Sequence, residues 1–468
     1  MKKLIVILAS VLITGNCLAQ NLEGKWSGIL KVQQYELRVI FNISQNGNLY
    51  SATLDSPDQG AKDIPIDSVW VEDNTFNYTA ESLKMEYTGE ISTDNKVIEG
   101  TLNQMGIEIP LKLSLLEQEE KMTNRPQTPV GPFPYKVEEI TFENTRDNIT
   151  LAGTLTLPNE GSDFPSVILI SGSGPQDRDE EIFEHRPFKI IADALTKKGI
   201  AVLRFDDRGV GESTGIFDEA TTADFATDVT FALEYLLGRD DIDPSKIGLI
   251  GHSEGGLIAP MVASQKNDIS FIVLMAGPGI PCDELLILQS AKAGRLGGMD
   301  EDFIIVNSNL QKGLYDILKQ NGNDENLEIL LKDKLRSSLA DIPSEYKPST
   351  ESEVESLIES EVKKISSPWF SFFIQQDPKD YLEQVSCPVL AINGTLDSQV
   401  LAKENLSGIE KTLTKSGNKC FKIIELQGLN HLFQEAETGA FAEYSKIEQT
   451  FSPVFIETMT SWILEETY

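Results

Sequence analysis

The sequence predicts an α/β protein in which a mostly parallel sheet of eight strands is covered by helices, with a small all-β domain before it. Three observations predict this fold class. From residue 135 to residue 468, buried runs of strand length alternate with amphipathic runs of helix length. Between residues 20 and 116, polar and apolar residues alternate in short runs separated by turn residues, as in antiparallel strands. Residues 117–134 join the two regions through a charged run and a proline-rich run, which is typical of an extended linker.

Residues 1–19 have the three parts of a secretory signal peptide. Lys2 and Lys3 give a positive start, residues 4–14 form an apolar run, and the run that ends at Ala19 is a small-residue cleavage site. The apolar run is shorter than a transmembrane helix requires. We therefore expect a cleaved signal peptide and an exported protein, periplasmic or extracellular, with no insertion into a membrane.

Composition restricts the partners of the protein. The formal net charge of −33 disfavours nucleic acid and anionic membrane surfaces, because both would repel the chain. The histidines and cysteines show no metal-ligand spacing, so we expect no metal site and no cofactor. Without Cys17, three cysteines remain, a sparse and odd set that does not resemble a disulfide framework. Cys387 and Cys420 begin predicted core strands, so we expect both to be buried free thiols.

The N-terminal region reads as a meander of antiparallel strands, closed into a small barrel or sandwich. Its strand-like runs are Tyr35–Phe41, Leu49–Leu54, Ser68–Val71, Thr75–Tyr78, Lys84–Tyr87, Val97–Leu102 and Ile107–Leu113. Such a domain suits ligand binding, and it equally suits packing or dimerisation. The sequence leaves these roles open, including a homodimer.

The second region has the elements of a sheet covered on both faces. A leading hairpin is expected at Lys136–Phe142 and Ile149–Leu157, followed by the strands Ser166–Ile170, Ile200–Phe205, Ile247–Ile250, Phe271–Ala276, Val389–Asn393 and Phe421–Leu426. Helices are expected at Pro187–Lys198, Thr222–Leu237, Leu401–Lys415 and from about Ile447 to Glu465. This alternation predicts mostly parallel strands joined by helices.

Gly-His-Ser-Glu-Gly, residues 251–255, stands between a buried strand and a helix and matches the G-x-S-x-G pattern of a nucleophile elbow. A serine on such a strained turn projects above the sheet, and glycines two positions away on either side let neighbouring backbone approach. Ser253 is therefore the predicted nucleophile. The backbone N–H of Glu254 would face the oxygen of an attacked acyl group.

A serine nucleophile needs a base, and the chain has three histidines. His252 lies inside the elbow, where its side chain should point away from the working face of the serine. His185 precedes a predicted helix. His431, in a loop after a predicted strand, is therefore the candidate base. Asp397 ends the loop after another buried strand and is the candidate that orients it, which gives the chain order Ser253, Asp397, His431.

The glycine-rich loop at residues 171–179 follows the third strand, where a second oxyanion donor is expected. Ser173 is the first candidate for its backbone N–H and Gly174 the second; the spacing does not decide between them. A phosphate cradle is a weaker interpretation, because the loop lacks the lysine and spacing of a P-loop. Nearby, Asp207 and Arg208 are expected to form an ion-paired turn that fixes the loop.

From about residue 281 to residue 385 the regular alternation stops. Several helices are expected there: Asp283–Leu296, Asp302–Lys319, Glu325–Leu339 and Ser352–Ile365. An insertion between the sixth and seventh strands would lie over the C-terminal strand ends, so it is expected to be a helical cap. The aromatic cluster that begins at Trp369 suits either the lining of a substrate pocket or packing of the cap on the core.

Together, the blocks at residues 171–179, 186–188, 206–213 and 251–256 resemble bacterial α/β-hydrolases of the EstD-like carboxylesterase group, relatives of serine aminopeptidases and prolyl-oligopeptidase-type hydrolases. The resemblance covers residue 135 to the end. It implies the α/β-hydrolase fold and hydrolysis of short acyl esters of small molecules, with the triad on Ser253, Asp397 and His431.

Two other functions remain open on the sequence. A serine peptidase would use the same triad with a cap that captures a peptide N-terminus, which requires carboxylates in the pocket. A non-catalytic binding protein would use the β domain and keep the hydrolase fold as a scaffold. The three candidate residues in order disfavour the second of these.

Overall fold

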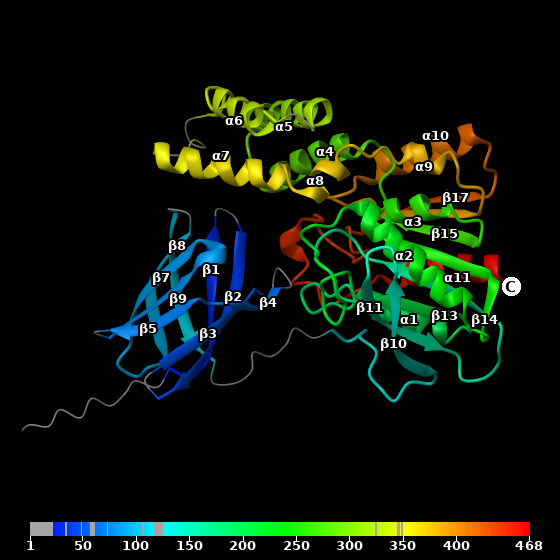
Figure 1. The fold of residues 1–468 in the computed structure, drawn as a ribbon, viewed down its shortest axis with the longest axis horizontal. Helices are drawn as coiled ribbons and strands as arrows, with labels where there is room; N and C mark the ends of the chain where they lie inside the picture. The colour runs from blue at the N-terminus through cyan, green and yellow to red at the C-terminus, as the bar shows by residue number, and fades with distance from the viewer. Residues whose placement is uncertain are drawn as a thin grey trace, which may run out of the picture. The chain divides into compact units, whose positions relative to one another are not determined.

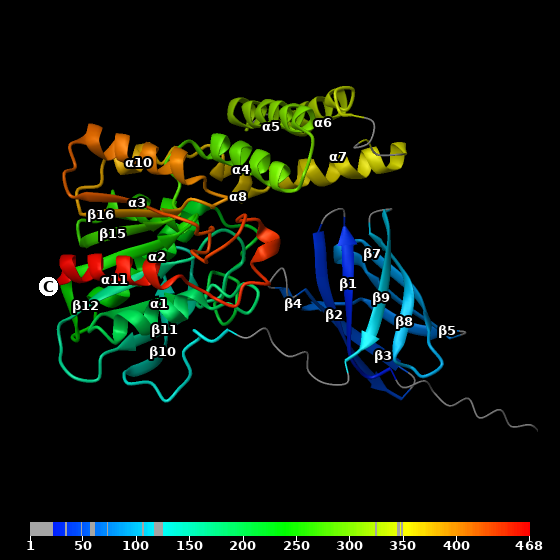
Figure 2. The ribbon, with the colours of Figure 1, turned by 180° about the vertical axis from the view of Figure 1, so that it is seen from behind.

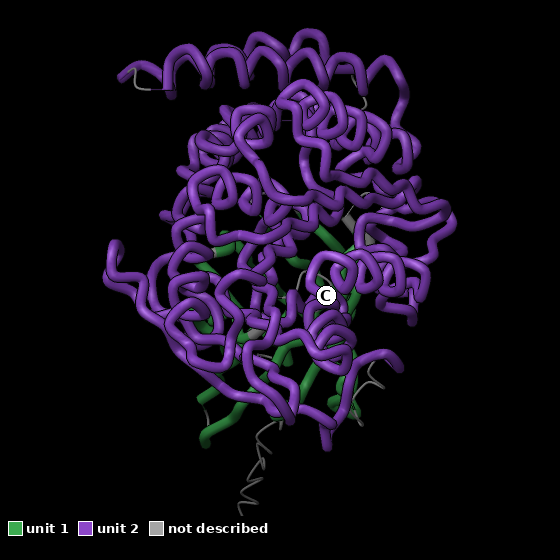
Figure 3. The backbone as a smooth tube through the Cα atoms, turned by 90° about the vertical axis from the view of Figure 1, so that its right-hand side faces the viewer, with its two compact units in different colours: residues 1–57, 61–120 green, residues 58–60, 121–468 purple. Residues whose placement is uncertain are grey.

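The computed structural model describes residues 22–32, 35–47, 49–56, 61–72, 74–104, 107–116, 125–322, 325–343, 347 and 350–468. The predicted signal peptide lies outside the described residues. The chain divides into two compact units, residues 1–57 with 61–120, and residues 58–60 with 121–468 (Figure 3). The division falls inside the predicted linker. Among the described residues, none of the helices combines the length and the apolar character needed to cross a membrane.

The first unit is one antiparallel sheet of nine strands, in the order β4-β3-β2-β1-β9-β8-β7-β6-β5. The strands are β1 Gly24–Val32, β2 Tyr35–Asn46, β3 Leu49–Ser56, β4 Ala61–Pro65, β5 Ser68–Glu72, β6 Thr75–Ala80, β7 Met85–Ile91, β8 Val97–Gln104 and β9 Ile107–Leu115. The sheet curls into a half-barrel, and β5 comes against β3. Burial alternates regularly along β7, and the core of this sheet contains Trp26, Phe41, Phe76, Tyr78 and Tyr87.

The second unit is built on an eight-stranded sheet in the order β10-β11-β13-β12-β14-β15-β16-β17 (Figures 1 and 2). Its strands are β10 Lys136–Asn144, β11 Ile149–Leu157, β12 Phe164–Ile170, β13 Ala201–Phe205, β14 Ile242–His252, β15 Ile269–Met275, β16 Val389–Gly394 and β17 Phe421–Leu426. The first two strands are antiparallel to their neighbours, and all pairs from β13 onward along the sheet are parallel. The predicted fold class is confirmed.

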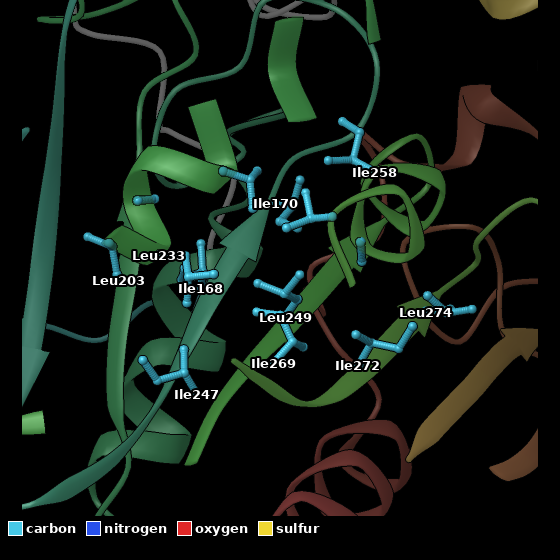
Figure 4. Packing of buried hydrophobic residues seen from close by; sticks show 14 of the residues in the cluster. Ile168, Ile170, Leu203, Leu233, Ile247, Leu249, Ile258, Ile269, Ile272 and Leu274 are labelled. Carbon is cyan, nitrogen blue, oxygen red and sulfur yellow. The ribbon is translucent and has the colours of Figure 1, made fainter. Parts of the chain in front are cut away.

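Helices cover both faces of this sheet because its central strands are apolar on both sides. Along β12, Ile168 faces a core that includes α2 (Thr222–Leu237), α3 (Gly255–Ala263) and α10 (Ala402–Ser416). Leu169 faces the opposite core, which includes α1 (Pro187–Thr196) and α11 (Pro453–Thr467). Figure 4 shows the first of these cores, with Leu249 of β14 at its centre.

Among the described residues, six helices stand between β15 and β16, at the predicted place of the cap. They are α4 Cys282–Leu296, α5 Glu301–Asn321, α6 Leu327–Ser338, α7 Glu351–Ile365, α8 Pro368–Phe373 and α9 Lys379–Leu382. Helices α4 to α8 lie together on one side of the unit (Figure 1). Leu314, Leu331, Ile358 and Phe370 join α5, α6, α7 and α8 in a separate small core.

The structure corrects one expectation about the cysteines. Cys420 is exposed and Cys387 is half-buried, whereas both were expected in the core. Cys420 precedes β17, which is the last strand of the sheet and therefore has a neighbour on one side only. Cys282, at the start of α4, is the buried cysteine of the three.

A first prediction concerns the core around β14. Leu249→Ala removes a side chain with no exposed surface and should lower the free energy of unfolding by about 2–5 kcal/mol. Ile216→Ala, at a site with 58% exposure, is the matched control and should change it by less than about 0.5 kcal/mol. Urea unfolding of both variants measures the difference, and equal losses would contradict the assigned core.

Candidate active site

Ser253 occupies the turn between β14 and α3 with a left-handed backbone, φ of 53°. This conformation is costly for a residue other than glycine and is held by tight packing around the turn. A Cβ on Gly251 would overlap the carbonyl oxygen of Gly255, and one on Gly255 would overlap that of Ile170 in β12. The two glycines of the motif are therefore required by backbone contact, as the pattern predicts.

Asp397 and His431 are in direct contact. Asp397 follows β16, and its Oδ1 accepts the backbone N–H groups of Gln399 at 2.8 Å and Val400 at 2.9 Å. The other oxygen, Oδ2, lies 2.8 Å from Nδ1 of His431, and both side chains are buried. A carboxylate fixed in this way holds the proton of the imidazole on Nδ1, which leaves Nε2 as the acceptor.

The loop of His431 lies against the elbow. Nε2 of His252 is 3.1 Å from the carbonyl oxygen of His431, and the two ring centroids are 4.8 Å apart. The parallel strands β14, β16 and β17 thus bring Ser253, Asp397 and His431 to the same edge of the sheet. Within the described residues no hydrogen bond joins the Ser253 hydroxyl to His431, and this bond is often loose in hydrolases without substrate.

The glycine-rich loop passes directly beside Ser253, the predicted nucleophile. A Cβ on Gly172 would be 3.2 Å from Cβ of Ser253. The N–H of Gly172 donates to Oε1 of Glu180 at 2.7 Å, so it is not free to donate to an oxyanion. In the part of the chain that the structure describes, the N–H groups of Ser173 and Gly174 have no acceptor, as an oxyanion donor requires. Both remain predicted donors.

Glu254 has a second role through its side chain. Its Oε1 accepts hydrogen bonds from the hydroxyl of Thr222 at 2.6 Å and from Nε1 of Trp369 at 2.8 Å. Burial raises the pKa of Glu254 to about 7, although both hydrogen bonds act in the opposite direction. Trp369 also stacks on Phe373, so the aromatic cluster of the cap reaches the elbow itself.

The predicted ion-paired turn is correct for Arg208 and wrong for Asp207. The guanidinium of Arg208 contacts Asp228 and Asp147, both at 2.8 Å. Asp207 instead accepts the hydroxyl of Ser171 at 2.8 Å and holds the glycine-rich loop through it. Because burial raises the pKa of Asp207 well above its usual value, this site favours a hydrogen-bonded carboxyl group over an ion pair.

The two histidines set aside as bases have other partners. His185 contacts the hydroxyl of Thr450 at 2.8 Å and the side chain of Gln434 at 2.9 Å. Burial lowers the pKa of His185 to about 4, which keeps the ring neutral. His252 contacts Glu180, a residue that sequence reasoning did not single out. Among the described residues, no group of three histidine, cysteine or acidic side chains could hold a metal ion.

Glu254 should make stability depend on pH. Between pH 4.5 and about 7 its carboxyl group holds a proton in the folded chain and not in the unfolded chain, so unfolding releases a proton. The folded state therefore loses stability as pH rises through this window. Across this window the free energy of unfolding of the wild type should fall by up to about 3 kcal/mol relative to that of Glu254→Gln.

Urea unfolding at about pH 5 and about pH 8 measures this change, and Glu219→Gln, at an exposed position, is the matched control. If the free energies of unfolding of Glu254→Gln and the wild type differ by the same amount at both pH values, the raised pKa of Glu254 is contradicted.

Comparisons with known proteins find similarity to hydrolases. Esterase EstD of Thermotoga maritima is 28% identical over 337 residues, 72% of this chain and 69% of that protein. Human dipeptidyl peptidase 8 is 32% identical over 162 residues, 32% of this chain and 17% of that protein. Among solved structures, an esterase of Pyrococcus furiosus has a TM-score of 0.42 and 19% identity, over 74% of this chain and 97% of that one.

The model of the alpha/beta hydrolase fold matches residues 165–425, more than half of the chain. These residues extend from β12 to β17 and include Ser253 and Asp397; His431 follows shortly after. The chain therefore belongs to the α/β-hydrolase family.

Proposed function

We propose that the protein is an exported serine esterase that cleaves carboxylic esters of small molecules with short acyl groups. The observation that carries the proposal is the buried Asp397–His431 pair, at 2.8 Å, at the sheet edge where Ser253 stands on its strained turn. Similarity to esterase EstD supports esterase-type chemistry. The predicted signal peptide supports export.

The reaction follows from the roles of these groups. His431 Nε2 takes the hydroxyl proton as Ser253 Oγ attacks the acyl carbon. The N–H groups of Glu254 and of Ser173 or Gly174 hold the negative oxygen of the tetrahedral intermediate. His431 then gives the proton to the leaving alcohol, and an acyl-enzyme remains. Water, activated by the same histidine, attacks this ester and releases the acid; the reaction requires no cofactor.

The position of the cap favours a small substrate. Trp369 of α8 donates a hydrogen bond to the side chain of Glu254, the residue after the proposed nucleophile, so this part of the cap lies close to the proposed reaction site. The formal charge of −33 disfavours nucleic acids and other polyanions as substrates or partners. A homodimer through the half-barrel remains a second proposal for that unit.

A serine peptidase is the alternative function. The partial similarity to dipeptidyl peptidase 8 favours it, and Glu254 and Asp207 are buried carboxyl groups near the elbow. A peptide amine would need one of these carboxylates ionised and within reach. Aminoacyl anilides test this alternative beside the esters.

The proposal predicts that p-nitrophenyl esters from acetate to octanoate are hydrolysed with a maximum at a short chain length. In Ser253→Ala the nucleophile is lost, and turnover should fall by a factor on the order of 10⁶, as in comparable triads. Ser264→Ala, at the residue directly after α3, is the matched serine control and should keep wild-type rates. The hydroxyl of Ser264 bonds only to the carbonyl of Met261 in the described structure.

Equal rates for Ser253→Ala and the wild type would contradict the mechanism. Cleavage of aminoacyl anilides with inactivity toward all the esters would favour the peptidase. Labelling of the wild type by a fluorophosphonate probe, absent from Ser253→Ala, identifies the nucleophile independently of the substrate.

A further inference from the structure

Glu180 and His252 form a buried contact that the proposed reaction does not use. Both side chains are about 5% exposed, and His252 Nδ1 lies 2.9 Å from Glu180 Oε1. The same carboxylate oxygen accepts the N–H of Gly172 at 2.7 Å. Glu180 itself stands on a left-handed turn, with φ of 52°, which aims its side chain back toward the elbow.

The partners of His252 determine how many protons its ring carries. Nε2 lies 3.1 Å from the carbonyl oxygen of His431, which can only accept a hydrogen bond, so Nε2 must carry a hydrogen. Nδ1 faces the carboxylate of Glu180, which also accepts. A ring between two acceptors is satisfied when both of its nitrogens are protonated, and it is then a cation.

The charges nearby favour this state. Burial alone would lower the pKa of His252, but the carboxylate of Glu180, helped by Asp397, raises it instead. The N–H of Gly172 donates to the same oxygen of Glu180 and holds it beside the ring. The other ring within reach is that of His431. Its centroid is 4.8 Å away, and its Nδ1 is held by Asp397.

We propose that Glu180 and His252 are a charged pair that positions the active site, holding the glycine-rich loop and the loop of His431 in place beside Ser253. One end of the pair fixes the peptide of Gly172, which precedes the predicted oxyanion donor Ser173. The other end fixes the backbone of the base. This positioning role rests on the proposed function, whereas the ionisation of the ring does not.

Kinetics of three variants test the positioning role. Glu180→Gln removes the charge, His252→Gln keeps a donor near the Nε2 position, and His252→Asn keeps one near Nδ1. Because oxyanion contacts act in the transition state, each variant should lower kcat about 10- to 100-fold and leave KM nearly unchanged. Rates are expressed per site titrated with the fluorophosphonate probe, so that misfolded protein is not counted.

The double variant Glu180→Gln with His252→Gln should have a kcat only slightly lower than that of either single variant, because each substitution breaks the same pair.

The ring itself gives a readout that needs no variant to fold. In the full chain labelled with ¹⁵N-histidine, the His252 ring should have both nitrogens protonated at about pH 7.5. His185, whose pKa is about 4, is the internal control and should show a neutral ring. Glu180→Gln should convert His252 to the neutral form.

Each outcome separates this inference from the proposed function. A neutral His252 ring overturns the charged pair, and variants with wild-type kcat per titrated site overturn its positioning role. A wild type that neither hydrolyses esters nor reacts with the probe overturns the proposed function, and the positioning role with it.

Discussion

The left-handed backbone of Ser253 is the constraint on which the rest of the second unit depends. A residue with a side chain in this conformation costs on the order of 1–3 kcal/mol, so the turn persists only where its surroundings impose it. Here α3 packs so closely on β14 that glycine is required at position 251, and so closely on β12 that glycine is required at position 255. This packing requires a rigid sheet beneath. β12 is buried along its whole length, and β14 and β15 are buried along the halves that lead toward the turn.

Burial and the hydrogen-bond partners together determine whether the acidic groups around that turn are charged or neutral. Glu254 and Asp207 accept hydrogen bonds from neutral donors, and burial raises the pKa of both. Glu180 is as buried as they are, but it faces an imidazole ring and a backbone N–H. One small region thus keeps two carboxyl groups near their neutral form and one opposite a cation. The same principle lets neighbouring carboxyl groups in active sites take different roles.

The sequence was sufficient for features with a local pattern and insufficient for contacts made across the chain. Strand and helix periodicity predicts the sheet, and the G-x-S-x-G spacing predicts the turn of Ser253. Glu180 and His252 are 72 residues apart, and Trp369 and Glu254 are 115 apart; no local pattern indicates such pairs. The assignment of Cys420 to the core failed for a related reason, since the edge position of β17 is a property of the whole sheet.

Glu254 joins the two parts of the protein that the sequence could describe only separately. Its backbone N–H is a predicted donor to the oxyanion, and its side chain holds Trp369 of the cap. The sheet supplies chemistry that many α/β hydrolases share, so selectivity must come from elements inserted above it. In this chain the inserted helix α8 contacts the elbow at Glu254. A substrate that displaced Trp369 would also remove a hydrogen-bond partner of the residue that carries the predicted oxyanion donor. Under the proposed function, contact with the cap and the rate of the chemical step would then be coupled.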